Sequence, residues 1–184
     1  MPSGSASPTT TPTWYRRLPP GLRRVAADSD RLPRLRLDPS PGLRQAVAEL
    51  PPALVSARPR AVQSVGQRIA DGVCCDLAVA KVRIRVAARR PHDQRGELHG
   101  LYTPRAPVGP DEITLWMLTA KRGQVVAYRT FLRTLLHELS HHLDYTLFRL
   151  RDSLHTQGFY ERESSLFGAL VPHGDGSLAH PIGE

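Results

Sequence analysis

Residues 124–149 read QVVAYRTFLRTLLHELSHHLDYTLFR, and apolar residues recur in them at three- and four-residue steps. The series consists of Val125, Tyr128, Leu132, Leu135, Leu139 and Leu143. This spacing places the apolar side chains on one face of an α-helix, and neither proline nor glycine interrupts the stretch. We therefore predict one long helix over Gln124–Arg149 that packs against the core.

Within this helix, residues 137–141 read HELSH. Residues four apart on a helix project from the same face, so His137 and His141 direct two imidazoles toward one point. Glu138 lies beside them, about 100° around the helix axis. Two nitrogen ligands and a neighbouring carboxylate suit hydrolytic zinc, because the ion activates water and the carboxylate accepts its proton. The pattern predicts His137 and His141 as metal ligands and Glu138 as the catalytic base.

A catalytic zinc ion needs a third protein ligand, and the chain after the helix offers two. His155 lies in the sequence HTQGFY (residues 155–160), at a break between two helical stretches. An extended connection is long enough to bring it back to the metal. Glu163 is the alternative and projects from the last predicted helix. We favour His155.

Three short segments before the long helix indicate strands. Val82, Ile84 and Val86 alternate with basic residues in Lys81–Ala87, which is typical of a strand with one buried face. Glu97–Thr103 and Ile113–Leu118 follow, separated by a proline- and glycine-rich turn. Further helices are predicted over Leu43–Leu50, Arg60–Leu77 and about Gly158–Leu170. The predicted fold is α+β, with a small antiparallel sheet of about three strands packed on helices.

Length and composition indicate one domain with two flanking segments. Of the 184 residues, we assign 42–172 to the domain and 173–184 to a disordered tail. Residues 1–41 are rich in proline and arginine and show no period, so we predict a disordered N-terminal segment. Residues 1–44 hold eight arginines and three aspartates, and thus most of the net charge of +8. This excess favours solubility, with weak nucleic-acid contact as the alternative.

The chain shows no sign of membrane insertion or export. No window offers the roughly 18 consecutive apolar residues of a membrane span, and the first residues lack the apolar core of a signal peptide. We therefore expect a cytoplasmic protein without a membrane partner. The oligomeric state does not follow from the sequence.

The motif and its surroundings resemble a known superfamily. HELSH on a helix that follows a small sheet is similar to the zincin metallopeptidases. HTQGFY resembles the H-x-x-x-F-[WY] element by which the SprT-like and WLM-type branches supply a third histidine. The resemblance implies a zincin-like domain with His137, His141 and His155 as Zn²⁺ ligands and Glu138 as base. Glu163 and the residues after it resemble instead the segment that supplies a glutamate ligand in ImmA/IrrE-like zincins, and we favour the former branch.

Several neighbours of the motif are candidates for supporting roles. Asp144 is placed to accept a hydrogen bond from a ligand imidazole, or else it is a solvated helix residue. His142 shares the stripe of Glu138, although packing is the more usual role for such a histidine. Tyr145, Tyr160 and Arg162 are candidates to stabilise an oxyanion.

Two classes of function follow from these observations. The first is a zinc metallopeptidase that hydrolyses peptides or unfolded protein with water activated by Glu138. The zincin resemblance implies that such a substrate binds in extended form along Glu97–Thr103 or Ile113–Leu118. The second is a non-catalytic, zinc-stabilised module that regulates or binds a partner and is associated with nucleic acid.

Overall fold

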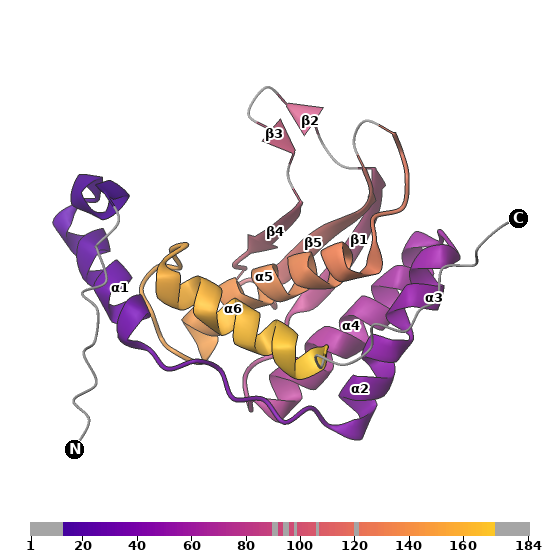
Figure 1. Ribbon diagram of the computed structural model, residues 1–184, viewed down its shortest axis with the longest axis horizontal. Helices are drawn as coiled ribbons and strands as arrows, with labels where there is room; N and C mark the ends of the chain where they lie inside the picture. The colour runs from indigo at the N-terminus through magenta and orange to yellow at the C-terminus, as the bar shows by residue number, and fades with distance from the viewer. Residues whose placement is uncertain are drawn as a thin grey trace, which may run out of the picture.

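The structure, a computed structural model, has the predicted α+β fold (Figure 1). It describes residues 13–89, 92–93, 96–97, 99–105, 107–119 and 122–171. The helices are η1 Thr13–Arg17, α1 Pro20–Arg31, α2 Pro41–Ala48, α3 Leu50–Val55, α4 Pro59–Asp76, α5 Tyr128–Thr146 and α6 Gln157–Leu170. The strands are β1 Arg83–Arg89, β2 His92–Asp93, β3 Gly96–Glu97, β4 Gly100–Thr103 and β5 Glu112–Leu118. The predicted tail 173–184 lies outside the described residues.

The central sheet has three strands, as predicted, but its order is β1-β5-β4. β5 runs parallel to β1 and antiparallel to β4, so the prediction of an antiparallel sheet is wrong. Burial explains the difference. β5 buries Ile113, Leu115 and Met117 on one face and Trp116 on the other, and a strand buried on both faces belongs at the centre of a sheet. β2 and β3 form a separate two-stranded pair.

The two outer edges of this sheet differ. Along β1, the side chain of Gln63 accepts a hydrogen bond from the backbone N–H of Val86 at 3.0 Å. Gln67 accepts one from the N–H of Ile84 at 2.8 Å and donates one to the carbonyl of Val82 at 2.9 Å. These side chains of α4 cover an edge that would otherwise expose backbone polar groups. At the opposite edge, β4 pairs only with β5 among the described strands, and it packs beside α5.

The predicted helices are present, with small changes at their ends. α5 begins at Tyr128 because Val125 is extended and forms a β-bridge with Leu118. Pro51 and Pro52 follow α2 but occupy the first turn of α3. Proline lacks the N–H that the first turn of a helix leaves without an intrahelical partner, so these prolines end one helix and begin the next.

The apolar face of α5 forms the centre of the core. Leu132, Leu135, Leu139 and Leu143 are fully buried, as their spacing predicted. α5 packs against β4 and β5, and α6 packs against α5 (Figure 1). Consequently the polar residues of the HELSH segment lie where α5, α6 and the β4 edge meet.

The prediction of disorder over residues 1–41 is wrong for residues 13–41. Helix α1 packs against α6 and buries Val25, Ala26 and Ser29, and the chain then continues past α6 to α2 (Figure 1). Polar contacts between residues far apart in the sequence hold α1 in place. Arg162 of α6 donates to the Ser29 carbonyl at 2.7 Å and to its hydroxyl at 2.9 Å. Residues 1–12 lie outside the described part of the chain.

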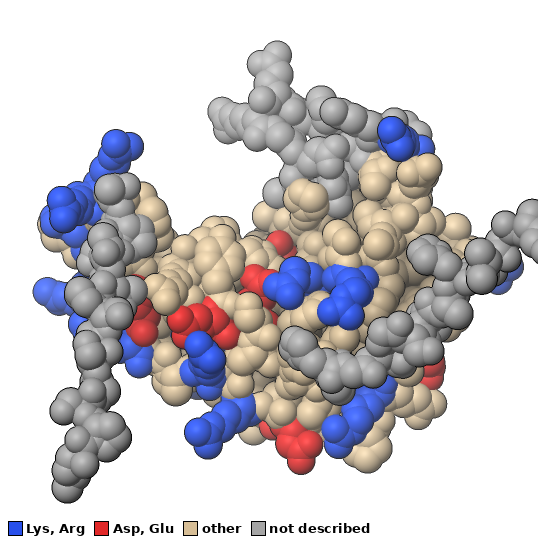
Figure 2. Space-filling view, in the orientation of Figure 1, with Lys and Arg blue, Asp and Glu red and all other residues tan. Residues whose placement is uncertain are grey.

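Several basic residues of the N-terminal region form ion pairs. Arg31 pairs with Asp28, Arg34 with Glu161 and Arg44 with Asp38. The exposed arginines of η1 and α1 include Arg16, Arg17, Arg23 and Arg24. Figure 2 shows Lys and Arg at the α1 end of the molecule and others spread among acidic side chains. Within the described residues, no helix is both long and apolar enough to span a bilayer.

Candidate metal centre

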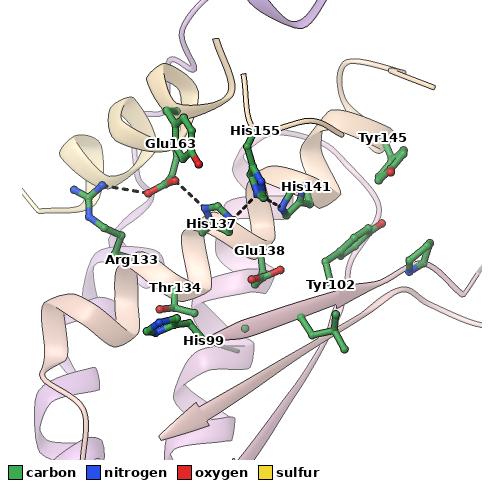
Figure 3. Close-up of a pocket in the computed structure, with 14 residues that line it drawn as sticks. His99, Tyr102, Arg133, Thr134, His137, Glu138, His141, Tyr145, His155 and Glu163 are labelled. Atoms are coloured by element: carbon green, nitrogen blue, oxygen red, sulfur yellow. Dashed lines mark hydrogen bonds and ion pairs between the residues drawn. The ribbon is translucent and has the colours of Figure 1, made fainter. Parts of the chain in front are cut away.

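Three imidazoles converge at the junction of α5 and α6, as the sequence predicted. His137 and His141 lie one turn apart on α5, and His155 comes from the connection to α6 (Figure 3). The Nε2 atom of His155 lies 3.0 Å from Nε2 of His137 and 3.1 Å from Nε2 of His141. One nitrogen from each ring lies within 4.8 Å of the other two, which is a separation that could hold a metal ion.

These separations suit a tetrahedral ion. Metal–nitrogen bonds of about 2.0–2.1 Å at tetrahedral angles place two ligand nitrogens about 3.3 Å apart, close to the observed values. Burial and the nearby imidazoles lower the pKa of His141 to about 3. Burial and the charge of His137 also lower the pKa of His155. Both rings are therefore neutral at physiological pH, so each has a nitrogen lone pair available for a metal.

The connection between α5 and α6 brings His155 to this point. Beyond α5 the chain turns at Arg149, which has a φ of 56°, in the left-handed region. Thr156 then caps α6 by accepting a hydrogen bond from the N–H of Phe159 at 3.1 Å. Phe159 is fully buried, and its ring centroid lies 4.7–5.2 Å from those of the three imidazoles. It forms an apolar floor beneath them.

Glu163 supports a ligand and does not join the cluster of nitrogens. Its Oε2 lies 3.0 Å from Nδ1 of His137, on the side of the ring away from His155 (Figure 3). Its Oε1 accepts a hydrogen bond from Arg133 at 3.1 Å. Burial lowers the pKa of His137, but the hydrogen bond with Glu163 and the charges of Glu138 and Glu163 prevail and raise it. The carboxylate thereby holds a proton on Nδ1 and leaves Nε2 for a metal, so the geometry favours His155 over Glu163 as third ligand.

His141 has a different support. Its Nδ1 lies 2.7 Å from the hydroxyl of Ser153, which donates to Oδ2 of Asp144 at 2.7 Å. Oδ1 of Asp144 accepts a hydrogen bond from Arg162 at 2.9 Å. Of the two roles considered for Asp144, the solvated one is wrong, because the residue is fully buried, and its contact with the imidazole of His141 runs through Ser153. Ser153 could not be predicted from the sequence, because it lies in the connection after α5 and helical spacing describes only residues on the helix.

Glu138 is buried beside the three imidazoles and lines the same cleft. Burial raises the pKa of its carboxyl group, against the opposing effect of the charge on His137. The position depends on Gly100 of β4, because a Cβ there would lie 2.6 Å from Oε1 of Glu138. A side chain larger than hydrogen at Gly100 would displace the carboxylate.

Two of the candidates for supporting roles at the site, His142 and Arg162, instead stabilise the fold. His142 is buried, and its Nε2 donates to the carbonyl of Ala80 at 2.7 Å, while Nδ1 lies 3.3 Å from Asp111. It does not line the cleft. Arg162 is likewise buried among its contacts with Ser29 and Asp144, which excludes it as an oxyanion donor.

Tyr145 and Tyr160 do line the cleft. The hydroxyl of Tyr145 donates to Asp152 at 3.3 Å. Tyr160 is 49% exposed, and its ring stacks on that of His155 with centroids 5.9 Å apart. The cleft has a volume of about 860 Å³ and is bounded by β4 on one side and by α5 and α6 on the other (Figure 3).

Comparison with known proteins does not place this chain in a family. No family description, curated protein or solved structure matches it. The chemistry of the site is therefore inferred from its own side chains, which are three imidazoles and a buried carboxylate in a cleft beside a sheet edge.

Proposed function

We propose that this protein is a zinc-dependent peptidase. The observation that carries the proposal is the convergence of His137, His141 and His155 beside the buried carboxylate of Glu138 in one cleft. The three imidazoles would hold the ion, which when bound supplies an activated water and polarises a carbonyl. Three nitrogen ligands without a thiolate suit zinc and leave one coordination position open, as catalytic sites do.

Glu138 is the proposed proton acceptor. Its carboxyl group is buried, and burial raises its pKa toward the range in which a base accepts a proton from water and then passes it on. Glu163 and Ser153 keep protons on the outer nitrogens of His137 and His141, so that both rings present Nε2 to the metal. For the oxyanion we favour Tyr160 over Tyr145, because the hydroxyl of Tyr145 is already bonded to Asp152.

The position of β4 supports a peptide as substrate. An extended peptide binds the edge of a sheet through backbone hydrogen bonds, with little dependence on its sequence. The β1 edge is covered by glutamines of α4, whereas β4 lines the cleft beside the imidazoles. Peptides or unfolded protein segments in the cytoplasm are therefore the proposed substrates. Of the two predicted edges, β4 is favoured because β5 is the central strand.

The test is substitution of the base. We expect Glu138→Gln to keep zinc and to lower kcat for peptide cleavage about 10²- to 10⁴-fold, which is the usual contribution of a general base. Zinc content is measured by atomic absorption, and cleavage is measured with an unfolded protein such as casein. Glu49→Gln is the matched control, because Glu49 pairs with Arg68 at an exposed site away from the cleft.

Two results would contradict the proposal. Full cleavage by the Glu138→Gln protein with zinc bound would remove Glu138 as base. A parent protein that binds zinc and gains thermal stability from it, but cleaves nothing, would instead support the zinc-stabilised module.

A further inference from the structure

A second pocket adjoins the metal cleft. It has a volume of about 670 Å³ and shares His155 and Tyr160 with the cleft. The rest of its lining comes from Trp14 of η1, from Arg34 in the segment after α1, and from four polar residues of α6, which are Gln157, Glu161, Ser164 and Ser165. We call this space the Trp14 pocket. Because His155 lines both spaces, the pocket begins at the proposed metal ligands.

The pocket presents two aromatic rings to solvent. Trp14 is 38% exposed and Tyr160 is 49% exposed, although large aromatic side chains are usually well buried. They are two of the few large apolar side chains that are exposed in the described part of the chain. Exposed aromatic rings beside a reactive centre are a feature of ligand sites, because they offer a large contact area with few rotatable bonds.

The wall that carries Trp14 is fixed to α6. The ring of Tyr15 lies edge-on to that of Trp14 at 4.3 Å, and its hydroxyl donates to Asp30 at 2.5 Å. The other oxygen of Asp30 accepts the N–H of Gly158 at 2.8 Å. A Cβ at Gly158 would lie 2.5 Å from the Ser29 carbonyl, so α1 and α6 are in close contact. The pocket is thus preformed, with little freedom to lose when a ligand enters.

The charges in the pocket are balanced. Arg34 pairs with Glu161 at 3.2 Å, and Gln157 donates to the other oxygen of Glu161 at 2.9 Å. An acidic or basic side chain that entered would have to displace one of these partners. An uncharged side chain would keep the ion pair and contact the aromatic rings.

We propose that the Trp14 pocket binds a large apolar or aromatic side chain of the peptide substrate, on a residue next to the bond that is cleaved. This inference rests on the proposed peptidase function. His155 lines both the cleft and the Trp14 pocket. Each residue of an extended peptide advances the chain by only about 3.3 Å, so the side chain that enters the pocket belongs to a residue next to the cleaved bond. The N-terminal region would then determine cleavage specificity, in addition to stabilising the fold.

The experiment compares two fluorogenic peptides that differ only in having Phe or Ala on both sides of the cleaved bond. With the zinc-loaded full chain, we expect kcat/KM to be about 10- to 100-fold higher for the Phe peptide, as burial of one aromatic side chain allows. Trp14→Ala should lower kcat/KM much more for the Phe peptide than for the Ala peptide, and so remove most of this preference. Trp14→Phe should restore it, because the ring is retained.

A matched control is Val55→Ala, which also truncates an exposed apolar residue, on α3. It should alter neither peptide's kcat/KM. Equal kcat/KM values for the two peptides, or an equal loss for both in Trp14→Ala, would overturn the proposal while leaving the peptidase function intact.

A binding measurement separates the pocket from catalysis. The chain has two tryptophans, Trp14 and Trp116, so Trp116→Phe leaves Trp14 as the only tryptophan reporter. The Phe peptide without its fluorophores should shift the Trp14 emission to shorter wavelength, and the Ala peptide should not. If the parent chain cleaves nothing, the peptidase function fails. In that case, a shift of the Trp14 emission with the Phe peptide still supports the Trp14 pocket as a binding site. The absence of a shift overturns the proposed pocket.

Discussion

Two acidic residues support two of the proposed ligand histidines in different ways. Glu163 bonds His137 directly, at 3.0 Å, and is held in turn by Arg133. Asp144 reaches His141 only through the hydroxyl of Ser153. Both arrangements fix the ring orientation and the tautomer, which is the usual task of groups around a metal site. Their loss should therefore weaken metal binding without abolishing it.

For Glu163→Gln, we expect zinc affinity to fall about 10- to 100-fold, which is typical for loss of a carboxylate behind a ligand histidine. The amide keeps the size of the side chain but loses the charge that holds a proton on His137. For His155→Ala we expect a much larger loss, because a ligand is removed. Zinc affinity is measured by competition with a chromophoric chelator. If Glu163→Gln lost zinc as completely as His155→Ala, Glu163 would have to be a direct ligand.

At the scale of elements, the contact between β4 and α5 positions Glu138, the proposed base. Gly100 leaves the space that the carboxylate of Glu138 occupies, and Thr134 also lies within 2.9 Å of a Cβ built at Gly100. At Gly100, β4 and α5 therefore approach each other so closely that only glycine fits between them. The close approach of these two elements is part of the geometry of the proposed active site.

We predict that Gly100→Ala lowers kcat for peptide cleavage at least about 10-fold, because small displacements of catalytic groups are costly. The same overpacking should lower the free energy of unfolding by about 1–3 kcal/mol. Zinc content should not change, since the three atoms nearest to a Cβ at Gly100 belong to Glu138 and Thr134 and not to a histidine. Gly109→Ala is the control, because a Cβ there meets nothing within 4 Å. Equal activity of the two variants would show that β4 moves freely relative to α5.

The sequence predicted those elements whose signal is local. The period of apolar residues identified α4, α5 and α6, and the HELSH spacing predicted that His137 and His141 converge in a cleft that Glu138 also lines. It did not predict the order of strands, because the choice of central strand depends on which segment is buried on both faces. It also missed α1, whose attachment relies on polar contacts of Ser29 and Asp30 with residues more than 120 positions away.

At the scale of the whole molecule, the N-terminal region is joined to the metal centre by a continuous chain of polar contacts. Ser29 of α1 bonds Arg162, Arg162 bonds Asp144, and Asp144 bonds the Ser153 hydroxyl that lies against His141. Ser29, Arg162 and Asp144 are buried. A buried guanidinium that loses its acceptors retains the cost of desolvation, so this chain of contacts is sensitive to removal of any member.

We therefore predict that the domain is incomplete without α1. Deletion of residues 1–31 removes both acceptors that Ser29 offers to Arg162, and we expect the free energy of unfolding to fall by about 3–5 kcal/mol. Ser29→Ala removes only the hydroxyl and should cost about 1–3 kcal/mol, whereas Arg24→Ala, on the exposed face of the same helix, should cost almost nothing. Urea denaturation and chelator competition measure stability and zinc affinity on the same samples. Zinc affinity should fall in the order Arg24→Ala, Ser29→Ala, deletion, because each step further loosens the support of His141. If the deleted chain bound zinc as tightly as the full chain at equal stability, α1 would merely rest on a domain that folds without it.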